Sequence, residues 1–330
     1  MRSRSILAGL VALGSVIGAT LVAAVAAPAL PVQAAGTTSA YVAMPTSQRL
    51  LDTRQATPVP AGGTISVAVA GAAPLPAPET VTAVVLNLTV TPPSAPGFWT
   101  VWPHTSPRPE ASNHNVDENQ FLAGNDTPNL VTVPLGSDGV VDISGSGGGT
   151  DIVDLLGYYT PAESATSGRF EPLATPTRVL DTRGVATFSA GETRAFTVPG
   201  AAGASAVAVN LTSVTDVPGF WQVYANGSPA PATSNLNSPA GFSAAIANQA
   251  IVTVDAAGAI SIYSENGGDL LIDLVGIYTG ASAPSSTTGL FVPMTTPTRI
   301  VDTRAAGLNP LGGTTRPSIG SSFEAVSYTH

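Results

Sequence analysis

The chain has 330 residues, a formal net charge of −9 and no cysteine, and all twelve of its basic residues are arginine. An acidic chain without a basic patch is a poor partner for nucleic acid or for an anionic membrane surface. The absence of cysteine excludes a disulfide framework and thiol catalysis, so we expect stability to come from packed apolar cores.

The N-terminal segment is typical of a secretory signal peptide. Arg2 and Arg4 precede an apolar run over residues 6–27, and the small-residue pattern V-Q-A follows at 32–34. An uncleaved membrane anchor is the alternative, because a run of 22 residues could cross a bilayer. Proline directly after the run favours cleavage, so we expect residues 1–34 to be removed and the chain to be exported to the cell envelope or beyond.

Six short sequence motifs (marks) occur twice, in the same order and about 120 residues apart. The clearest is the hexapeptide R-x-x-D-T-R at 49–54 and 178–183, which returns once more at 299–304. The others are N-L-T at 87–89 and 210–212, P-G-F-W at 96–99 and 218–221, S-N-x-N at 112–115 and 234–237, V-T-V at 131–133 and 252–254, and D-L-x-G-x-Y at 154–159 and 273–278. A period of this length indicates a duplicated domain rather than a solenoid repeat.

These marks predict the domain organisation. We expect repeat 1 over residues 41–160 and repeat 2 over 170–279, with linkers at 161–169 and 280–289. Residues 290–330 carry the third hexapeptide without the later marks, and we expect them to be a truncated third repeat.

Each repeat is predicted to consist of short β-strands. Residues 81–91 alternate with a period of two, and other β-branched or aromatic runs are separated by glycine, proline, asparagine and aspartate. The chain has 34 glycines and 29 prolines, which leave no room for a long helix in the mature part. We therefore predict an all-β protein of tandem β-sandwich or jelly-roll-like domains.

An aspartate lies in the middle of an apolar segment in each repeat, at Asp154 and Asp273. Burying a carboxylate without a cation is costly, and the hexapeptide supplies the only arginines that recur in both repeats. The planar guanidinium suits two-point pairing with a carboxylate. We predict a structural ion-pair cluster in each repeat, made of Arg49, Asp52, Arg54 and Asp154 in repeat 1 and of Arg178, Asp181, Arg183 and Asp273 in repeat 2.

The same carboxylates could instead act as the acid and base of a glycan hydrolase. Neighbouring arginines would keep both acids ionised, which is wrong for a proton donor, so the structural interpretation is favoured. His104 and His114 align with Asn226 and Leu236 in repeat 2, which excludes a duplicated histidine mechanism. No nucleotide-binding or metal-binding motif stands in a fitting context, so we expect no enzyme activity, no metal and no cofactor.

Aromatic and asparagine side chains form a second recurring set. An aromatic face beside asparagine amides is a common way to hold a sugar. The candidate ligand-binding residues are Trp99, Trp102, Asn113 and Asn115 in repeat 1 and Trp221, Tyr224, Asn235 and Asn237 in repeat 2. Alternatively, Phe98 and Trp99 are core residues while Asn113 and Asn115 bond the backbone of turns, and the frequent burial of large aromatic residues favours this interpretation.

The combined pattern of R-[LVI]-[LV]-D-T-R, N-L-T, P-G-F-W, S-N-x-N and D-L-x-G-x-Y resembles a repeat of secreted and cell-surface proteins of actinobacteria, sometimes found beside cell-wall or hydrolytic domains. The resemblance covers residues 41–160, 170–279 and the start of a third copy. It implies a β-module at the cell surface and no established activity.

From these observations we expect a secreted, non-enzymatic binding or adhesion module. Its partner would be a cell-wall or extracellular glycan or a surface protein, with neither nucleic acid nor, after signal cleavage, a membrane. The alternatives from other classes are a glycan-active hydrolase that uses the repeated carboxylates and a structural spacer that displays another domain.

Overall fold

The computed structural model describes residues 37–71, 75–122, 124–239, 245–294 and 297. The predicted signal peptide, the third hexapeptide and the rest of the third repeat beyond 297 lie outside the described residues. The described residues belong to one compact unit that contains both repeats. Among them, no helix is long and apolar enough to cross a membrane.

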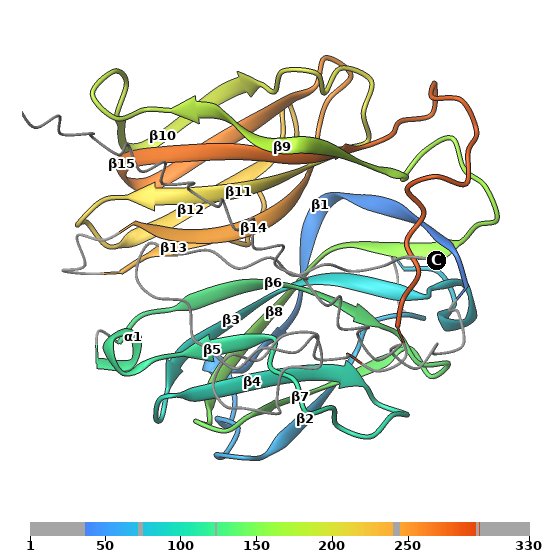
Figure 1. The fold of residues 1–330 in the computed structure, drawn as a ribbon. Helices are drawn as coiled ribbons and strands as arrows, with labels where there is room; N and C mark the ends of the chain where they lie inside the picture. Colours follow the sequence, from blue (N-terminus) through green and yellow to red (C-terminus); the bar gives the residue numbers. More distant parts are fainter. Residues whose placement is uncertain (1–36, 72–74, 123, 240–244, 295–296, 298–330) are drawn as a thin grey trace, which may run out of the picture. The chain divides into compact units, whose positions relative to one another are not determined.

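Repeat 1 consists of two four-stranded antiparallel sheets (Figure 1). The first has the order β1-β8-β3-β6, from β1 (Ser39–Asp52), β8 (Gly149–Pro161), β3 (Ala83–Pro93) and β6 (Thr127–Pro134). The second has the order β2-β7-β4-β5, from β2 (Thr64–Ala68), β7 (Val140–Gly145), β4 (Gly97–Pro103) and β5 (His114–Val116). The short helices η1 (Thr53–Gln55), η2 (Pro78–Thr80) and α1 (Glu118–Leu122) lie in the connections.

Repeat 2 has the same strand neighbours in the same order. Its strands are β9 (Phe170–Asp181), β10 (Phe188–Thr197), β11 (Ala206–Val214), β12 (Gly219–Ala225), β13 (Leu236–Ser238), β14 (Ile246–Thr253) and β15 (Ala259–Tyr278). The long β15 takes the places of both β7 and β8: its first part pairs with β10 and β12, and its second part with β9 and β11. The prediction of an all-β protein built from sandwich-like repeats is therefore confirmed.

The strand registers identify equivalent residues in the two repeats. Asn87 lies opposite Asp154 in repeat 1, and Asn210 lies opposite Asp273 in repeat 2. The V-T-V mark is the exception to the sequence alignment: β3 residue Val84 pairs with Val133, whereas its equivalent in β11 pairs with Val252. The equivalent of Val252 is therefore Val133, two positions from the sequence match. A slip of two residues preserves the alternation of inward and outward side chains, so the pattern alone could not detect it.

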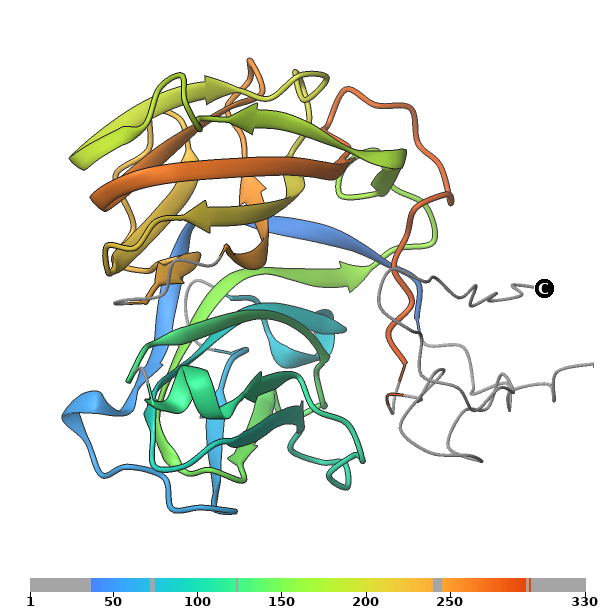
Figure 2. The ribbon, with the colours of Figure 1, turned by 60° about the vertical axis from the view of Figure 1, so that its left-hand side comes forward.

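Three apolar clusters hold the unit together. Each repeat has a core between its two sheets, and Trp99 and Trp221 occupy equivalent places in these cores with 1% of each residue exposed. A third cluster joins the repeats through the aromatic residues Tyr41, Tyr159 and Tyr278. Between the repeats, β1 (blue in Figures 1 and 2) contacts β12 and β14, and β6 contacts β13 and β14. Because water is excluded from all three clusters, the two repeats stabilise each other as well as themselves.

The two segments predicted as linkers are held against each other. Ala165 and Ser286 form an isolated β-bridge with hydrogen bonds in both directions. The buried side chain of Arg169 donates to the carbonyl oxygens of Ala165, Pro284 and Thr288. These bonds connect the two segments and contribute to the fixed contact between the repeats.

We predict that Gly168→Ala destabilises the protein more than Gly184→Ala. Both glycines have a positive φ, at +79° and +71°, so each alanine meets a similar backbone strain of about 1 kcal/mol. At Gly168 the added Cβ would also overlap the backbone oxygen of Tyr41, whereas nothing lies near the Cβ at Gly184. Urea unfolding should show a loss of about 3 kcal/mol or more for Gly168→Ala and about 1 kcal/mol for Gly184→Ala. Equal losses would contradict the close packing of the repeats at this position.

Candidate functional site

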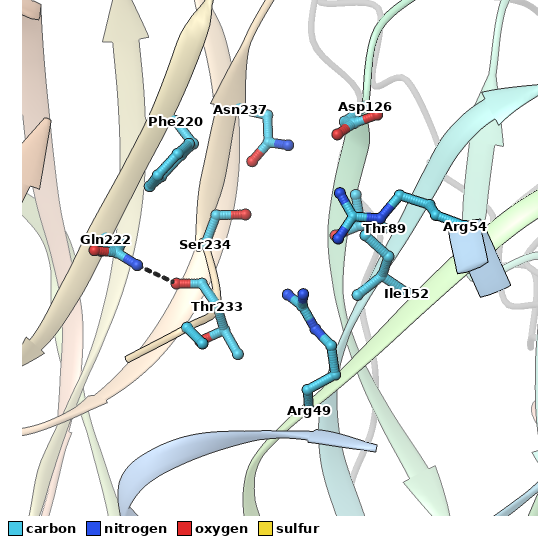
Figure 3. A pocket seen from close by; sticks show the side chains of 11 residues that line it. Arg49, Arg54, Thr89, Asp126, Ile152, Phe220, Gln222, Thr233, Ser234 and Asn237 are labelled. Atoms are coloured by element: carbon cyan, nitrogen blue, oxygen red, sulfur yellow. Dashed lines mark hydrogen bonds between the residues drawn. The ribbon is translucent and has the colours of Figure 1, made fainter. Parts of the chain in front are cut away.

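A cavity of about 290 Å³ lies between the two repeats (Figure 3). Repeat 1 contributes Arg49, Arg54, Thr89 and Asp126 to its lining. Repeat 2 contributes Phe220, Gln222, Ser234 and Asn237. The pocket therefore brings the hexapeptide of one repeat against the P-G-F-W and S-N-x-N segments of the other.

The hexapeptide wall is held by ion pairs. Arg49 donates from Nε and Nη2 to the two carboxylate oxygens of Asp154, at 2.9 and 3.3 Å, and from Nη1 to Asp52 at 3.3 Å. Arg54 donates from Nε and Nη2 to Asp52, at 2.9 and 2.6 Å, and Asp52 also accepts from the backbone N–H of Arg54. Arg49 is thus committed through all three guanidinium nitrogens. The Nη1 of Arg54 makes no hydrogen bond with the residues that the structure describes.

Repeat 2 forms the same pairs. Arg178 donates to both oxygens of Asp273, at 2.8 and 3.0 Å, and Arg183 donates to Asp181 at 2.9 and 2.7 Å. The two predicted clusters therefore have the same internal connections and differ in what covers them: the side chain of Asp154 is 2% exposed, and that of Asp273 is 23% exposed.

The acids of the repeat 1 cluster are poorly placed for proton transfer. The hydrogen bond from the Arg54 side chain lowers the pKa of Asp52 to about 2. Burial raises the pKa of Asp154, and the hydrogen bonds from Arg49 oppose that effect. Both oxygens of each carboxylate accept from arginine, so neither acid offers a free oxygen or a proton to a ligand in the cavity.

The repeat 2 wall is fixed by hydrogen bonds to repeat 1. Asn87 donates from Nδ2 to the carbonyl oxygen of Ser234 at 2.9 Å, and Asn248 donates to Oδ1 of Asn87 at 3.1 Å. Gln222 donates to the carbonyl oxygen of Thr233 at 3.0 Å, the bond drawn in Figure 3. Asn237 differs from these residues, because its buried Oδ1 has no hydrogen-bond partner among the described residues.

Most of the predicted ligand-binding residues are not at this site. Trp99, Trp102 and Trp221 are buried, so the prediction that they present a ring to a ligand is wrong. Trp99 and Trp221 point into the sandwich cores, and Nε1 of Trp221 donates to the Ser213 hydroxyl at 3.0 Å. Trp102 lies on the opposite face of β4, where the Arg108 guanidinium covers its ring at 5.8 Å from the centroid. The alternative that Trp99 belongs to the core is correct, whereas Phe98, also expected there, is 44% exposed.

The asparagines of the S-N-x-N segments divide into two roles. Asn113 accepts a hydrogen bond from the backbone N–H of Val101 in the adjacent strand, and Asn235 accepts one from that of Val223, each at 2.7 Å. These are the backbone bonds that the alternative interpretation expected of Asn113. The second asparagine of each segment is placed differently, since Asn115 is exposed and Asn237 lines the pocket.

Tyr224 and Asn235 line a separate cavity of about 20 Å³. A space of this size holds about one water molecule, so it is no ligand site. Asn237 is therefore the one member of the predicted ligand-binding set that lines the larger pocket.

Sequence reasoning missed Phe220, Arg54 and Ser234 as pocket residues. The alternation of side chains along a strand could have indicated Phe220, because a tryptophan at 221 in the core places Phe220 on the opposite face of the strand. No feature of the local sequence predicts that the P-G-F-W segment of repeat 2 contacts the hexapeptide of repeat 1.

The described residues contain no group of three metal-binding side chains. His114 is buried and its pKa is lowered to about 4 by desolvation, with its Nε2 beside the Thr127 hydroxyl at 2.9 Å. Asp151 is also buried, and desolvation raises its pKa to about 6, opposed by a hydrogen bond from Trp99. Both groups lie in the interior of repeat 1, away from the pocket lining.

Comparisons with known proteins add no functional information. No protein-family model matches the sequence, and no curated protein matches it. The N-terminal CBM22-1–CBM22-2 tandem domain of Xyn10C from Paenibacillus barcinonensis is 10% identical, with a TM-score of 0.19 over 76% of this chain and 99% of that one. The triple jelly-roll protein of an archaeal virus turret is 10% identical, with a TM-score of 0.20 over 71% of this chain and 60% of that one. Similarity at this level carries no argument, and the fold class rests on the strands themselves.

We predict that Arg49→Ala costs far more stability than Arg178→Ala. Removing Arg49 leaves the enclosed carboxylate of Asp154 without its cation, which should lower the free energy of unfolding by about 3 kcal/mol. Asp273 remains in contact with water, so Arg178→Ala should cost much less than Arg49→Ala. Urea unfolding at pH 7 measures both, and similar losses would show that burial does not distinguish the two clusters.

From the raised pKa of the buried Asp151 we predict that the free energy of unfolding depends on pH. Its pKa of about 6 in the folded state exceeds the ordinary aspartate value of 3.8, so the folded state binds the proton more tightly. The stabilising contribution is therefore present below pH 4 and is lost as the pH rises through about 6. Asp151→Asn should raise the free energy of unfolding at pH 7.5 by about 1–3 kcal/mol and change it little at pH 4. The exposed Asp216→Asn serves as the control and should have no such pH dependence.

Proposed function

We propose that this protein is a secreted, non-enzymatic binding module that holds a neutral sugar residue of a cell-wall or extracellular glycan in the pocket between its repeats. One observation carries the proposal: an aromatic ring and several hydrogen-bonding side chains line a single cavity. The ring is that of Phe220, and the polar side chains include Arg54, Ser234 and Asn237 (Figure 3).

The lining matches the two kinds of surface on a sugar ring. The Phe220 ring can cover the apolar face formed by the sugar C–H groups. The Arg54 guanidinium offers donors and the Asn237 amide offers both a donor and an acceptor, and a hydroxyl group can pair with either kind. The hydroxyls of Thr89 and Ser234 add groups that both donate and accept. A cavity of about 290 Å³ is at the small end of ligand sites, which suits one sugar residue of a longer chain.

The charges around the pocket favour a neutral ligand. Arg49 and Arg54 are matched by Asp52 and Asp154, and Asp126 adds a further carboxylate. The pocket therefore has no excess positive charge with which to attract a uronate or a phosphate, and the whole chain is acidic as well.

A binding role fits the carboxylates better than hydrolysis does. A glycosidase needs one protonated acid and one free carboxylate beside the scissile bond. Here the oxygens of Asp52 and Asp154 are occupied by arginine, and Asp126 is the one carboxylate among the described residues that line the pocket. Release of reducing sugar by the unmodified protein, lost in Asp126→Asn, would support the hydrolase instead.

Binding of the mature chain to a glycan array, followed by calorimetry on the strongest ligand, tests the proposal. Phe220→Ala and Asn237→Ala should each weaken binding about tenfold or more, because the first removes the ring and the second removes a hydrogen-bonding side chain of the lining. Phe98→Ala and Asn115→Ala change the equivalent residues of repeat 1, which do not line the pocket, and should leave the affinity unchanged. Equal losses in both sets, or no glycan bound at all, would overturn the proposal, and the latter result would favour a structural spacer.

A further inference from the structure

Repeat 2 covers the hexapeptide face of repeat 1, whereas the equivalent face of repeat 2 is open. Met44, five residues before Arg49, is 8% exposed, and Thr253 donates to its carbonyl oxygen from the other repeat. The equivalent Leu173, five residues before Arg178, is 38% exposed. An apolar side chain beside an uncovered ion-pair cluster is therefore exposed on repeat 2.

The asparagine of the N-L-T mark shows the same difference. Asn87 is buried and makes two hydrogen bonds to repeat 2, to Ser234 and Asn248. Its equivalent Asn210 is only half-buried and donates to Thr212 in its own strand at 3.3 Å. The face of repeat 2 thus retains the groups that bind a neighbour in repeat 1, without a neighbour among the described residues.

Three equivalent aromatic residues, one from each copy, form a closed ring of backbone hydrogen bonds. Tyr41 donates to the oxygen of Gly168 at 2.9 Å, and Phe170 donates to Gly289 at 2.8 Å. The ring closes when Phe291 donates to Ser39 at 2.8 Å. Each donor lies eight residues before a hexapeptide, and each acceptor lies two residues before the aromatic residue of the next copy.

The side chains follow the same cyclic order. Tyr41 of the first copy packs on Tyr278 of the second, with ring centroids 4.6 Å apart. Phe291 of the third copy packs on Tyr159 of the first, at 4.4 Å. Contacts that run from each copy to the next and return to the first after three steps indicate a closed three-fold arrangement rather than a two-fold dimer.

We propose that the open face of repeat 2 binds a third module of the same fold, joined to the chain through the segment that holds Phe291, so that three modules close into a ring. This module would present its S-N-x-N strand to Leu173, Asn210 and the repeat 2 hexapeptide, as repeat 2 does to repeat 1.

A second copy of the two-repeat unit does not fit this arrangement. If one of its repeats took the third position, the rotation that relates its two repeats would place the other repeat on one already occupied. The occupant is therefore a single module, and docking is independent of whether the pocket binds a sugar.

The absence of cysteine allows a direct test, because an introduced thiol is the only one in the chain. Residues 184–278 of repeat 2 are grafted after Arg304, which aligns with Arg183, to complete a third module. Leu173→Cys should react rapidly with a maleimide in the unmodified chain and about tenfold or more slowly in the extended chain, where reaction must await local opening. Adding Asn210→Ala to the extended chain should restore much of the fast reaction.

Two positions serve as controls. Met44→Cys should react slowly in both chains, since repeat 2 already covers it, and Val185→Cys, at a residue 85% exposed, should react rapidly in both. A second graft, residues 55–160 of repeat 1 after Arg304, repeats the test with a different module sequence. Slower labelling of Leu173→Cys with either graft supports the proposal, and unchanged labelling with both overturns it.

Discussion

The buried carboxylate of Asp154 is the constraint on which the repeat 1 side of the pocket depends. It lies in β8, between β1 and β3, and its side chain is almost fully enclosed. An ion in such a place needs a partner that satisfies both oxygens, and Arg49 on the neighbouring β1 does so in two-point geometry. The same guanidinium reaches Asp52, which in turn holds Arg54. A requirement of the core thus fixes the position of an arginine that lines a surface pocket.

The hexapeptide motif has different surroundings in the two repeats, and its contribution to the structure differs accordingly. The arginine–aspartate pairs have nearly the same lengths in both copies. In repeat 1 the other repeat covers the ion-pair cluster, so the cluster is part of the protein interior and also forms one wall of the pocket. In repeat 2 it stays in contact with solvent, where an ion pair contributes little to stability. The hexapeptide therefore combines a contact within its own repeat with a surface for the next repeat.

Polar contacts give this interface its register. An apolar cluster joins the repeats, but apolar packing has little directional preference. The bonds among Asn87, Ser234 and Asn248 fix one alignment, since a shift would leave buried amides unsatisfied. The same alignment leaves the buried Oδ1 of Asn237 without a partner.

The sequence by itself determined the fold class, the duplication and the partners of the hexapeptide arginines. Each of these follows from local pattern: alternation defines strands, ordered marks define repeats, and an acid in an apolar strand requires a cation. The sequence did not determine the exact register of β6 and β14, because a slip of two residues keeps the same side chains facing inward. The burial of Trp99 and the exposure of Phe98 depended on which face of β4 meets the second sheet. Only the tertiary structure decided that the pocket joins Arg54 to Phe220 and Asn237, because the relation between two repeats is set by contacts across their surfaces, and no local periodicity records those contacts.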